Sequence, residues 1–395
     1  MMSNPSGRIN RTRFNQSALY ETGALVCLLA YFISRFTPTM GVRHIIAFLG
    51  FLFIVLSLFD KVLEVTVRRR SIVLLGALAC YLLSVLLLAR HVDFDLIYRV
   101  CSFFVLAVVF SLAGTSAGIG VSKERVFFIF ALICLVCFAL SLSQTAYVGE
   151  GNWRYNGLTL GMTNPNLTGM MLSGCIDIMI MLLPHSKRTK LSLLLISSML
   201  YLLLRTNARS CIVTTVFLVI YVLLFAKRRV PTLIQLIAVL TPVLVVPIYL
   251  WASTRYSQQL FLGKPLFSGR ESVFTAAISL LDTPAHLLFG DLTAQRFNNA
   301  HNSFLTILAS LGVAGTFIVC LIFTNGVVCL GKSQVGIEQR LSLLSLLFVF
   351  VQSSAEASFL TGGFPTVLFI YLFVLVGNEA ENHHGDDCDI ESSTL

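Results

Sequence analysis

Three arginines lie where a chain rich in apolar residues is not expected to carry positive charge. Arg205 and Arg209 belong to the short stretch RTNAR between two apolar runs, and Arg270 belongs to a polar segment further along. A guanidinium group donates paired hydrogen bonds to phosphate, so this residue type is suited to anion binding. Asn207 could cap the following helix, whose amino-terminal end would then face the same anion. The alternative, which the sequence leaves open, is that Arg205 and Arg209 reach toward lipid headgroups.

A histidine and an asparagine, His301 and Asn302, directly precede the apolar run that begins at Ser303. Imidazole titrates near neutral pH, so His301 is a candidate general base for a hydroxyl group. Asn302 beside it is a candidate hydrogen-bonding group for a polar substrate. A histidine at the edge of an apolar run can equally be an ordinary interfacial residue, and spacing alone does not separate the two interpretations.

Arg270 lies in a long polar insertion, residues 252–302, whose charged side chains indicate that it lies outside the bilayer. Ser268 and Glu271 fit a capping box at the start of a helix. Apolar residues then recur at helical spacing, which predicts a short amphipathic helix lying on the membrane or on the protein. The sequence Asp-Thr-Pro at 282–284 predicts the end of this helix. The apolar positions are Val273, Phe274, Ala277, Ile278 and Leu281.

A second polar loop, residues 149–166, is rich in amide and aromatic side chains, which hydrogen-bond and stack on sugars. It contains Arg154, Asn164 and Asn166, all candidates for binding a polar substrate. Asn164 followed by Pro165 also fits an N-cap and the first residue of a helix. An ordered loop with a capped helix explains the same residues, and both interpretations stay open.

Asp177 lies midway along an apolar run. A carboxylate inside a membrane helix is a functional candidate by default. A hydrogen bond that packs two helices together explains it equally well.

These residues are set among apolar runs that only a membrane protein would carry. The 395 residues are 56% hydrophobic and 12% charged, with a mean hydropathy of +0.84, and a soluble domain has about twice that share of charge. Lipid leaves the backbone no other partner, so the runs are helices and the fold class is all-α and polytopic. Hydropathy predicts about twelve spans, with the long external loop between spans nine and ten. Their ranges are 17–34, 43–59, 71–89, 96–114, 126–148, 166–184, 190–204, 210–226, 232–251, 303–330, 341–356 and 364–377.

Basic residues predict the orientation of these spans. Seventeen of the 28 Lys and Arg residues fall in the loops on the side of the termini, so both termini are expected in the cytoplasm and the long insertion outside. The net charge of +9 is largely this topology signal and does not argue for nucleic acid as a partner. The ten cysteines are scattered, mostly within spans, and we predict no metal site.

The chain divides into three parts. Residues 1–16 are a cytoplasmic amino terminus without an apparent cleavable signal peptide. Residues 17–377 are the transmembrane domain, with the external loop at 252–302. Residues 378–395 form an acidic, serine-rich tail that is predicted to be disordered.

The order of these motifs resembles the O-antigen polymerase and O-antigen ligase superfamily. The resemblance covers about residues 153–315, and the first five spans agree in hydropathy only. It rests on twelve spans, Arg154-x-x-Gly157, Asn164-Pro165-Asn166, Ala208-Arg209-Ser210, Gly269-Arg270, and His301-Asn302 before a Leu-rich span that contains Gly312-x-x-Gly315.

The resemblance implies an inverting glycosyltransferase that uses glycans on undecaprenyl pyrophosphate at the outer face of the bacterial inner membrane. It implies no nucleotide sugar, metal or other cofactor. Arg209 and Arg270 would bind the pyrophosphate, and His301 would deprotonate or orient the acceptor hydroxyl. Arg154 and Arg205 would contact phosphate or sugar.

Two members of this superfamily differ in their acceptor. A polymerase joins the chain to another lipid-linked repeat unit, whereas a ligase joins it to lipid A-core. Asn164-Pro165-Asn166 and the modest loop favour polymerase, in O-antigen or capsule synthesis, with ligase as the alternative. A transporter of polysaccharide precursors is a third interpretation, although no internal repeat is visible. Partners are the lipid-linked glycan, membrane lipid and, as a further candidate, a chain-length regulator.

Overall fold

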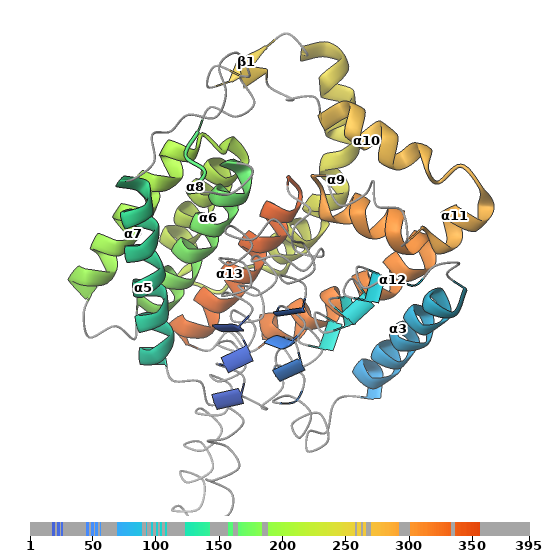
Figure 1. The fold of residues 1–395 in the computed structure, drawn as a ribbon, viewed down its shortest axis with the longest axis horizontal. Coiled ribbons are helices and arrows are strands. Elements are labelled where there is room, and N and C mark those ends of the chain that lie inside the picture. The colour runs from blue at the N-terminus through green and yellow to red at the C-terminus, as the bar shows by residue number, and fades with distance from the viewer. Residues whose placement is uncertain are drawn as a thin grey trace, which may run out of the picture.

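The structure is a computed structural model, and the part that it describes is almost entirely helical (Figure 1). The described residues are 18–19, 22–23, 25–26, 45–46, 49–50, 52–53, 56, 69–88, 92, 96–97, 100–101, 103–104, 107–108, 123–142, 157–160, 165–183, 189–256, 259–261, 264–265, 270–291, 301–332 and 336–355. The elements are α3 (Arg69–Leu88), α5 (Lys123–Leu142), α6 (Pro165–Leu182), α7 (Thr189–Thr206), α8 (Arg209–Phe225), α9 (Thr232–Tyr256), β1 (Leu260–Phe261), β2 (Lys264–Pro265), α10 (Arg270–Ser279), α11 (Pro284–Phe289), α12 (Ser303–Lys332) and α13 (Ile337–Ser353).

Three of these helices, α7, α9 and α12, are long and apolar enough to cross a membrane. Five shorter apolar helices, α3, α5, α6, α8 and α13, lie beside them. The prediction of a helical membrane protein is therefore confirmed at this level. Predicted spans 17–34, 43–59 and 96–114 fall only partly within the described residues. Span 364–377 and both terminal segments, 1–16 and 378–395, lie outside them.

Helix α13 lies at the centre of the bundle. It packs against α6, α8, α9 and α12, and Figure 1 shows it between the green helices and the orange ones. All residues from 341 to 350 are buried, so this part of α13 has no face of its own for lipid or water.

A buried hydrogen bond joins α6 to α13. The hydroxyl of Ser345 donates to Asp177 Oδ2 at 2.6 Å, and both side chains are buried. Ser345 is therefore the partner that the packing interpretation of Asp177 requires. The other carboxylate oxygen, Oδ1, is buried without a hydrogen bond among the described residues.

Helix α12 is broken at Gly312, where the sequence predicted one continuous span, 303–330. Gly312 has φ 59° and ψ −170°, which glycine adopts without a steric penalty. A Cβ at this position would collide with the backbone of Leu288 and Gly290, so the break lets the end of α11 pass against α12. The prediction of one continuous helix over this span is therefore corrected, because the chain changes direction at Gly312.

The short helix in the polar insertion is confirmed as α10. Phe274 and Ala277 are buried, whereas Ile278 is exposed. The helix ends at Ser279, just before the predicted stop at residues 282–284, and Ser268 lies outside the described residues. Those stop residues also begin α11, which the sequence analysis did not predict. Thr283 is its N-cap and accepts a hydrogen bond from the His286 amide at 3.1 Å.

Candidate functional site

The turn between α7 and α8 is tightly ordered. The Thr206 hydroxyl donates to the Leu203 carbonyl at 2.6 Å and accepts from the Ala208 amide at 3.1 Å. Asn207 has φ 55°, a left-handed conformation that asparagine tolerates better than most residues. The N-cap of α8 is Ala208, with no side-chain capping bond, so the prediction that Asn207 caps this helix is wrong. The turn fixes Arg209 as the first residue of α8.

The segment 157–160 lies directly against this turn. The Leu158 amide donates to the Arg205 carbonyl at 2.9 Å, and the Thr168 hydroxyl of α6 donates to the Thr159 carbonyl at 2.6 Å. A Cβ at Gly157 would collide with the Thr206 carbonyl, so only glycine permits this approach. The end of the second polar loop is thereby held beside Arg205.

Of the binding residues predicted in the second polar loop and in the turn before α8, Asn166 and Arg205 are described. Asn166 lies in the first turn of α6, where its carbonyl faces Cys211 Sγ of α8 at 3.9 Å. Arg205 is the next-to-last residue of α7, with its guanidinium carbon 6.0 Å from the Tyr201 ring centre. Arg154 and Asn164 lie outside the described residues. Substrate binding by all four stays a prediction.

Arg209 and Arg270 are brought together from separate helices. Each is the first residue of its helix. Burial lowers the pKa of the Arg209 guanidinium, and the positive charge of Arg270 lowers it further. The Tyr249 hydroxyl of α9 interacts with both charges. The Tyr249 ring lies 5.0 Å from the Phe274 ring, centre to centre, which fixes α10 against α9. The result is a half-buried pair of like charges beside a phenol.

A carboxylate accompanies this pair. Glu271 interacts electrostatically with Tyr249, and its Oε2 atom is buried without a hydrogen bond among the described residues. A buried carboxylate oxygen usually has a hydrogen-bond partner. Glu271 therefore places a negative charge near Tyr249, where Arg209 and Arg270 place positive ones.

Asn302 is the structural anchor of the His301 segment. Its side chain is fully buried, and its Nδ2 donates to the carbonyls of Pro242 and Ser354, both at 2.9 Å. Its Oδ1 accepts from the Leu305 amide at 3.0 Å, which caps α12. One side chain thus ties α12 to α9 and α13. These bonds occupy both ends of the amide, and substrate binding by Asn302 stays a prediction.

His301 takes its position from this anchor. It is half-buried and has φ 50°, a left-handed conformation that is uncommon for residues other than glycine. Such a conformation persists where the surroundings impose it, and functional sites are frequent among these places. The three bonds of Asn302 supply that constraint.

The carboxyl end of α13 connects the two halves of the site. The Ala355 carbonyl accepts a 2.7 Å hydrogen bond from Arg270 Nη1, and the adjacent Ser354 carbonyl accepts the bond from Asn302. One turn earlier, Gln352 Nε2 donates to Ser173 Oγ of α6 at 2.6 Å. Arg270 and the His301 segment are therefore held on neighbouring carbonyls. The negative end of a helix also favours a cation such as Arg270.

Sequence reasoning missed Tyr249 and the role of α13. A tyrosine close to the end of an apolar run looks like an interfacial anchor. Gln352 inside an apolar run did indicate that α13 makes polar contacts, since a buried amide must find hydrogen-bond partners. The identity of those partners is visible only in the folded chain.

The arrangement is suited to holding an anion. Two arginines at helix starts present donors and positive charge to one place, and a multiply charged phosphate would relieve their mutual repulsion. Within the described ranges, no group of three or more His, Cys, Asp or Glu side chains is placed to hold a metal ion. Comparison of the chain with protein-family models, with curated proteins and with solved structures gave no match.

Proposed function

We propose that this protein polymerises oligosaccharide repeat units carried on undecaprenyl pyrophosphate, forming O-antigen or capsular polysaccharide at the outer face of the bacterial inner membrane. The observation that carries the proposal is the pair of like charges, Arg209 and Arg270, beside Tyr249 at the ends of apolar helices. A lipid pyrophosphate has its charge at the membrane surface and its chain in the bilayer. It therefore fits an anion site at the end of a helical bundle.

The topology that this function needs follows from the sequence. The proposal includes about twelve spans with both termini in the cytoplasm, so that the Arg209 end of the bundle faces outward. Eight of the predicted spans coincide with apolar helices, to within a few residues at most ends.

The reaction is a single displacement at the anomeric carbon of the donor glycan. The hydroxyl oxygen of the acceptor sugar forms a bond to this carbon while the bond from the carbon to the pyrophosphate oxygen breaks, which inverts the configuration. His301 accepts the hydroxyl proton, and the pyrophosphate leaves with the bonding electrons on its lipid carrier. Arg209 and Arg270 stabilise the charge that develops on the leaving group, where preorganised donors have their largest effect. Ala355 keeps Arg270 in place through its carbonyl.

The saccharide ladder of a deletion strain tests this proposal. The strain is complemented with the wild-type chain, with Arg209→Ala, or with Arg255→Ala as the matched control. Arg255 is exposed and packs on Trp251, outside the site, so its loss removes the same charge without touching the pair.

Polymerase activity predicts a full ladder for wild type and for Arg255→Ala, and core bearing a single repeat unit for Arg209→Ala. Core without any unit, with long polymer retained on the lipid carrier, would instead identify a ligase. Repeat units accumulating on the inner leaflet would identify a transporter. A full ladder from Arg209→Ala at equal protein level would contradict the proposed site.

A further inference from the structure

We propose that α11, Pro284–Phe289, and the first half of α12, Ser303–Leu311, both lie within the lipid bilayer, with Leu287, Leu288 and Phe289 in contact with acyl chains. The sequence places the whole polar insertion outside the bilayer because of its charges. Within α11, however, His286 is the one titratable residue. This inference does not depend on the proposed function.

The apolar side chains of α11 have no protein cover. Leu287, Leu288 and Phe289 are 45%, 49% and 57% exposed, and none of the six residues of α11 is buried. Three consecutive large apolar side chains are costly to leave in water. The depth of α11 in the bundle indicates what surrounds these three side chains.

Helix α3 gives a first measure of depth. The Tyr81 hydroxyl donates to the carbonyls of Phe289 and Leu311, at 2.7 and 2.6 Å. Tyr81 lies seven residues before the end of α3 at Leu88, or about 10 Å at 1.5 Å per residue. Between them, Leu83 and Leu87 are 58% and 86% exposed, as lipid-facing residues would be. The end of α11 therefore lies deeper than side chains that are themselves suited to lipid.

A second contact shows which end of α3 lies on the same side of the membrane as the start of α12. Asn325 Nδ2 of α12 donates to the Ser71 hydroxyl of α3 at 3.2 Å, so the two helices run antiparallel. The Leu88 end of α3 thus lies on the same side as the start of α12. Ser71 follows the basic residues at 68–70, which mark the opposite membrane surface.

Helix α9 gives an independent measure. Trp251 is exposed, and Arg255 lies over its ring at 5.2 Å, a pairing typical of a membrane interface. Asn302 is bonded to the carbonyl of Pro242, nine residues before Trp251, or about 13 Å along the helix. The start of α12 therefore also lies below the interface. Helices α3 and α9 place the two ends of the half-helix Ser303–Leu311 within the bilayer.

Among the described residues, the backbone groups where α11 meets α12 have the bonds that this depth requires. Irregular backbone at membrane depth is tolerated only where its polar groups are paired within the protein. The Gly290 amide donates to the His286 carbonyl and the Asp291 amide to the Ala309 carbonyl, both at 2.8 Å. The Tyr81 hydroxyl lies within hydrogen-bond distance of both carbonyls at the tip, and its one proton serves either of them. The close approach of Gly290 to Gly312 brings these groups together.

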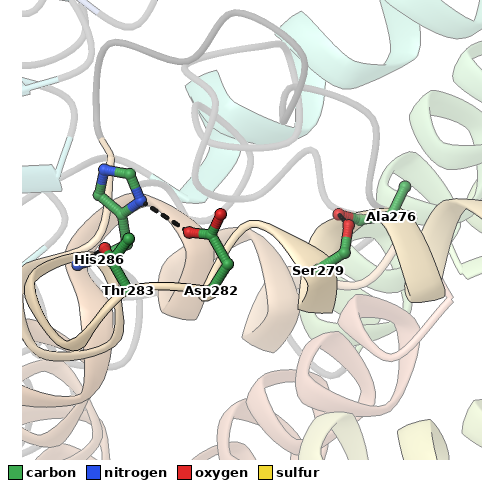
Figure 2. A network of polar contacts seen from close by, with 5 residues as sticks. All are labelled: Ala276, Ser279, Asp282, Thr283 and His286. Carbon is green, nitrogen blue, oxygen red and sulfur yellow. Dashed lines mark hydrogen bonds and ion pairs between the residues drawn. The ribbon is translucent and has the colours of Figure 1, made fainter.

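The polar entrance of α11 lies at its other end. Figure 2 shows Asp282, Thr283 and His286 at the elbow between α10 and α11, with His286 Nδ1 and Asp282 Oδ1 3.2 Å apart. The six residues of α11 then carry the chain about 9 Å from this polar elbow to Phe289. That is close to the depth measured from α3.

Acyl chains are the occupant that fits this surface. Beyond the break at Gly312, Val313 and Phe317 of α12 are also exposed, Phe317 to 63%. Because α11 packs on α12, the apolar surface of α11 continues along a helix long enough to cross a membrane. Lipid must cover the exposed side of α12 if this helix crosses the membrane, and the same lipid would cover α11 without a partner protein.

Tryptophan fluorescence in lipid vesicles tests the proposal. The parent chain carries Trp153→Phe and Trp251→Phe, which removes both native tryptophans. A single tryptophan is then introduced by Phe289→Trp, by Leu287→Trp, or by Thr275→Trp as the control on the exposed side of α10. Each chain is measured in vesicles of phosphatidylcholine with brominated or ordinary acyl chains, and with iodide in the water.

The proposal predicts a severalfold loss of fluorescence in brominated lipid for Phe289→Trp and a blue-shifted emission, with little effect of iodide. Thr275→Trp should be quenched by iodide and not by the lipid. Leu287→Trp should show the same quenching by brominated lipid and replaces Phe289→Trp if that variant does not fold. Quenching of the α11 tryptophans by iodide alone would overturn the proposal, and so would shielding from both quenchers, which indicates a protein cover.

Discussion

At the scale of residues, the central feature is that Arg209 and Arg270 are held near each other at the starts of α8 and α10. Each positive charge disfavours the other, and an anion bound between them would lower that cost. Ala355 holds Arg270 in place, and Tyr249 lies beside both guanidinium groups. The site is therefore preorganised for a multiply charged ligand before that ligand arrives.

Replacing Arg209 or Arg270 by lysine should preserve only part of the activity. Lysine retains the charge but loses the planar pair of donors that matches a phosphate. We expect shortened ladders for both lysine variants and none for the alanine variants at equal protein level. Lysine variants as active as wild type would show that charge alone suffices.

Substitutions of Asn302 and His301 should have different effects, the first on the stability of the fold and the second on activity. Asn302→Ala removes three buried hydrogen bonds and leaves the Pro242 and Ser354 carbonyls without this donor, so we expect a loss of about 3 kcal/mol in the free energy of unfolding. His301→Ala should lose activity with little change in thermal stability. Purified variants compared in detergent by thermal unfolding and by polymer formation check this. The roles would be wrong if His301→Ala were the less stable variant and active.

At the scale of elements, the bounds of the helices were predictable and their breaks were not. Span 210–226 was predicted and α8 is Arg209–Phe225, because hydropathy is a local property of the chain. The break at Gly312 depends on Leu288 and Gly290 passing beside it, a contact that no local pattern encodes. Helix α11 was missed for a simpler reason. Thr283-Pro284 was interpreted as a stop, although the same pair is a good start.

A substitution at Gly312 tests the break. Gly312→Ala places a Cβ against the Leu288 backbone at a positive φ, so we expect a loss of about 1–3 kcal/mol in stability. Gly76→Ala in α3 is the matched control, because a Cβ there meets nothing within 4 Å. Thermal unfolding of the two variants should differ clearly. Equal stability would mean that α11 does not press against Gly312.

At the scale of the whole molecule, the site is assembled from distant parts of the chain around the end of α13. Arg209, Tyr249, Arg270 and Asn302 come from four helices, and α13 contacts three of those regions through its last residues. The sequence predicted most of these residues individually, from their types beside apolar runs. Their convergence depends on tertiary packing, and the choice of Ala355 and Ser354 as acceptors could not be predicted.

The orientation of the bundle can be tested with reporter fusions. Both termini are expected in the cytoplasm, so a fluorescent protein fused at either end should fold and fluoresce. A periplasmic phosphatase inserted at residue 263, between the short strands β1 and β2, should be active because the proposed topology puts this end outside. Activity from the termini instead would invert the topology and place the arginine pair on the wrong side for the proposed substrate.

The most direct test of the central claim is the reaction itself, with purified protein and a synthetic oligosaccharide repeat unit on undecaprenyl pyrophosphate. We expect the wild-type chain and Arg255→Ala to lengthen the glycan and to release one undecaprenyl pyrophosphate for each bond formed. Arg209→Ala, Arg270→Ala and His301→Ala should form none. A wild-type chain that folds, binds the substrate and never joins two units would contradict the account.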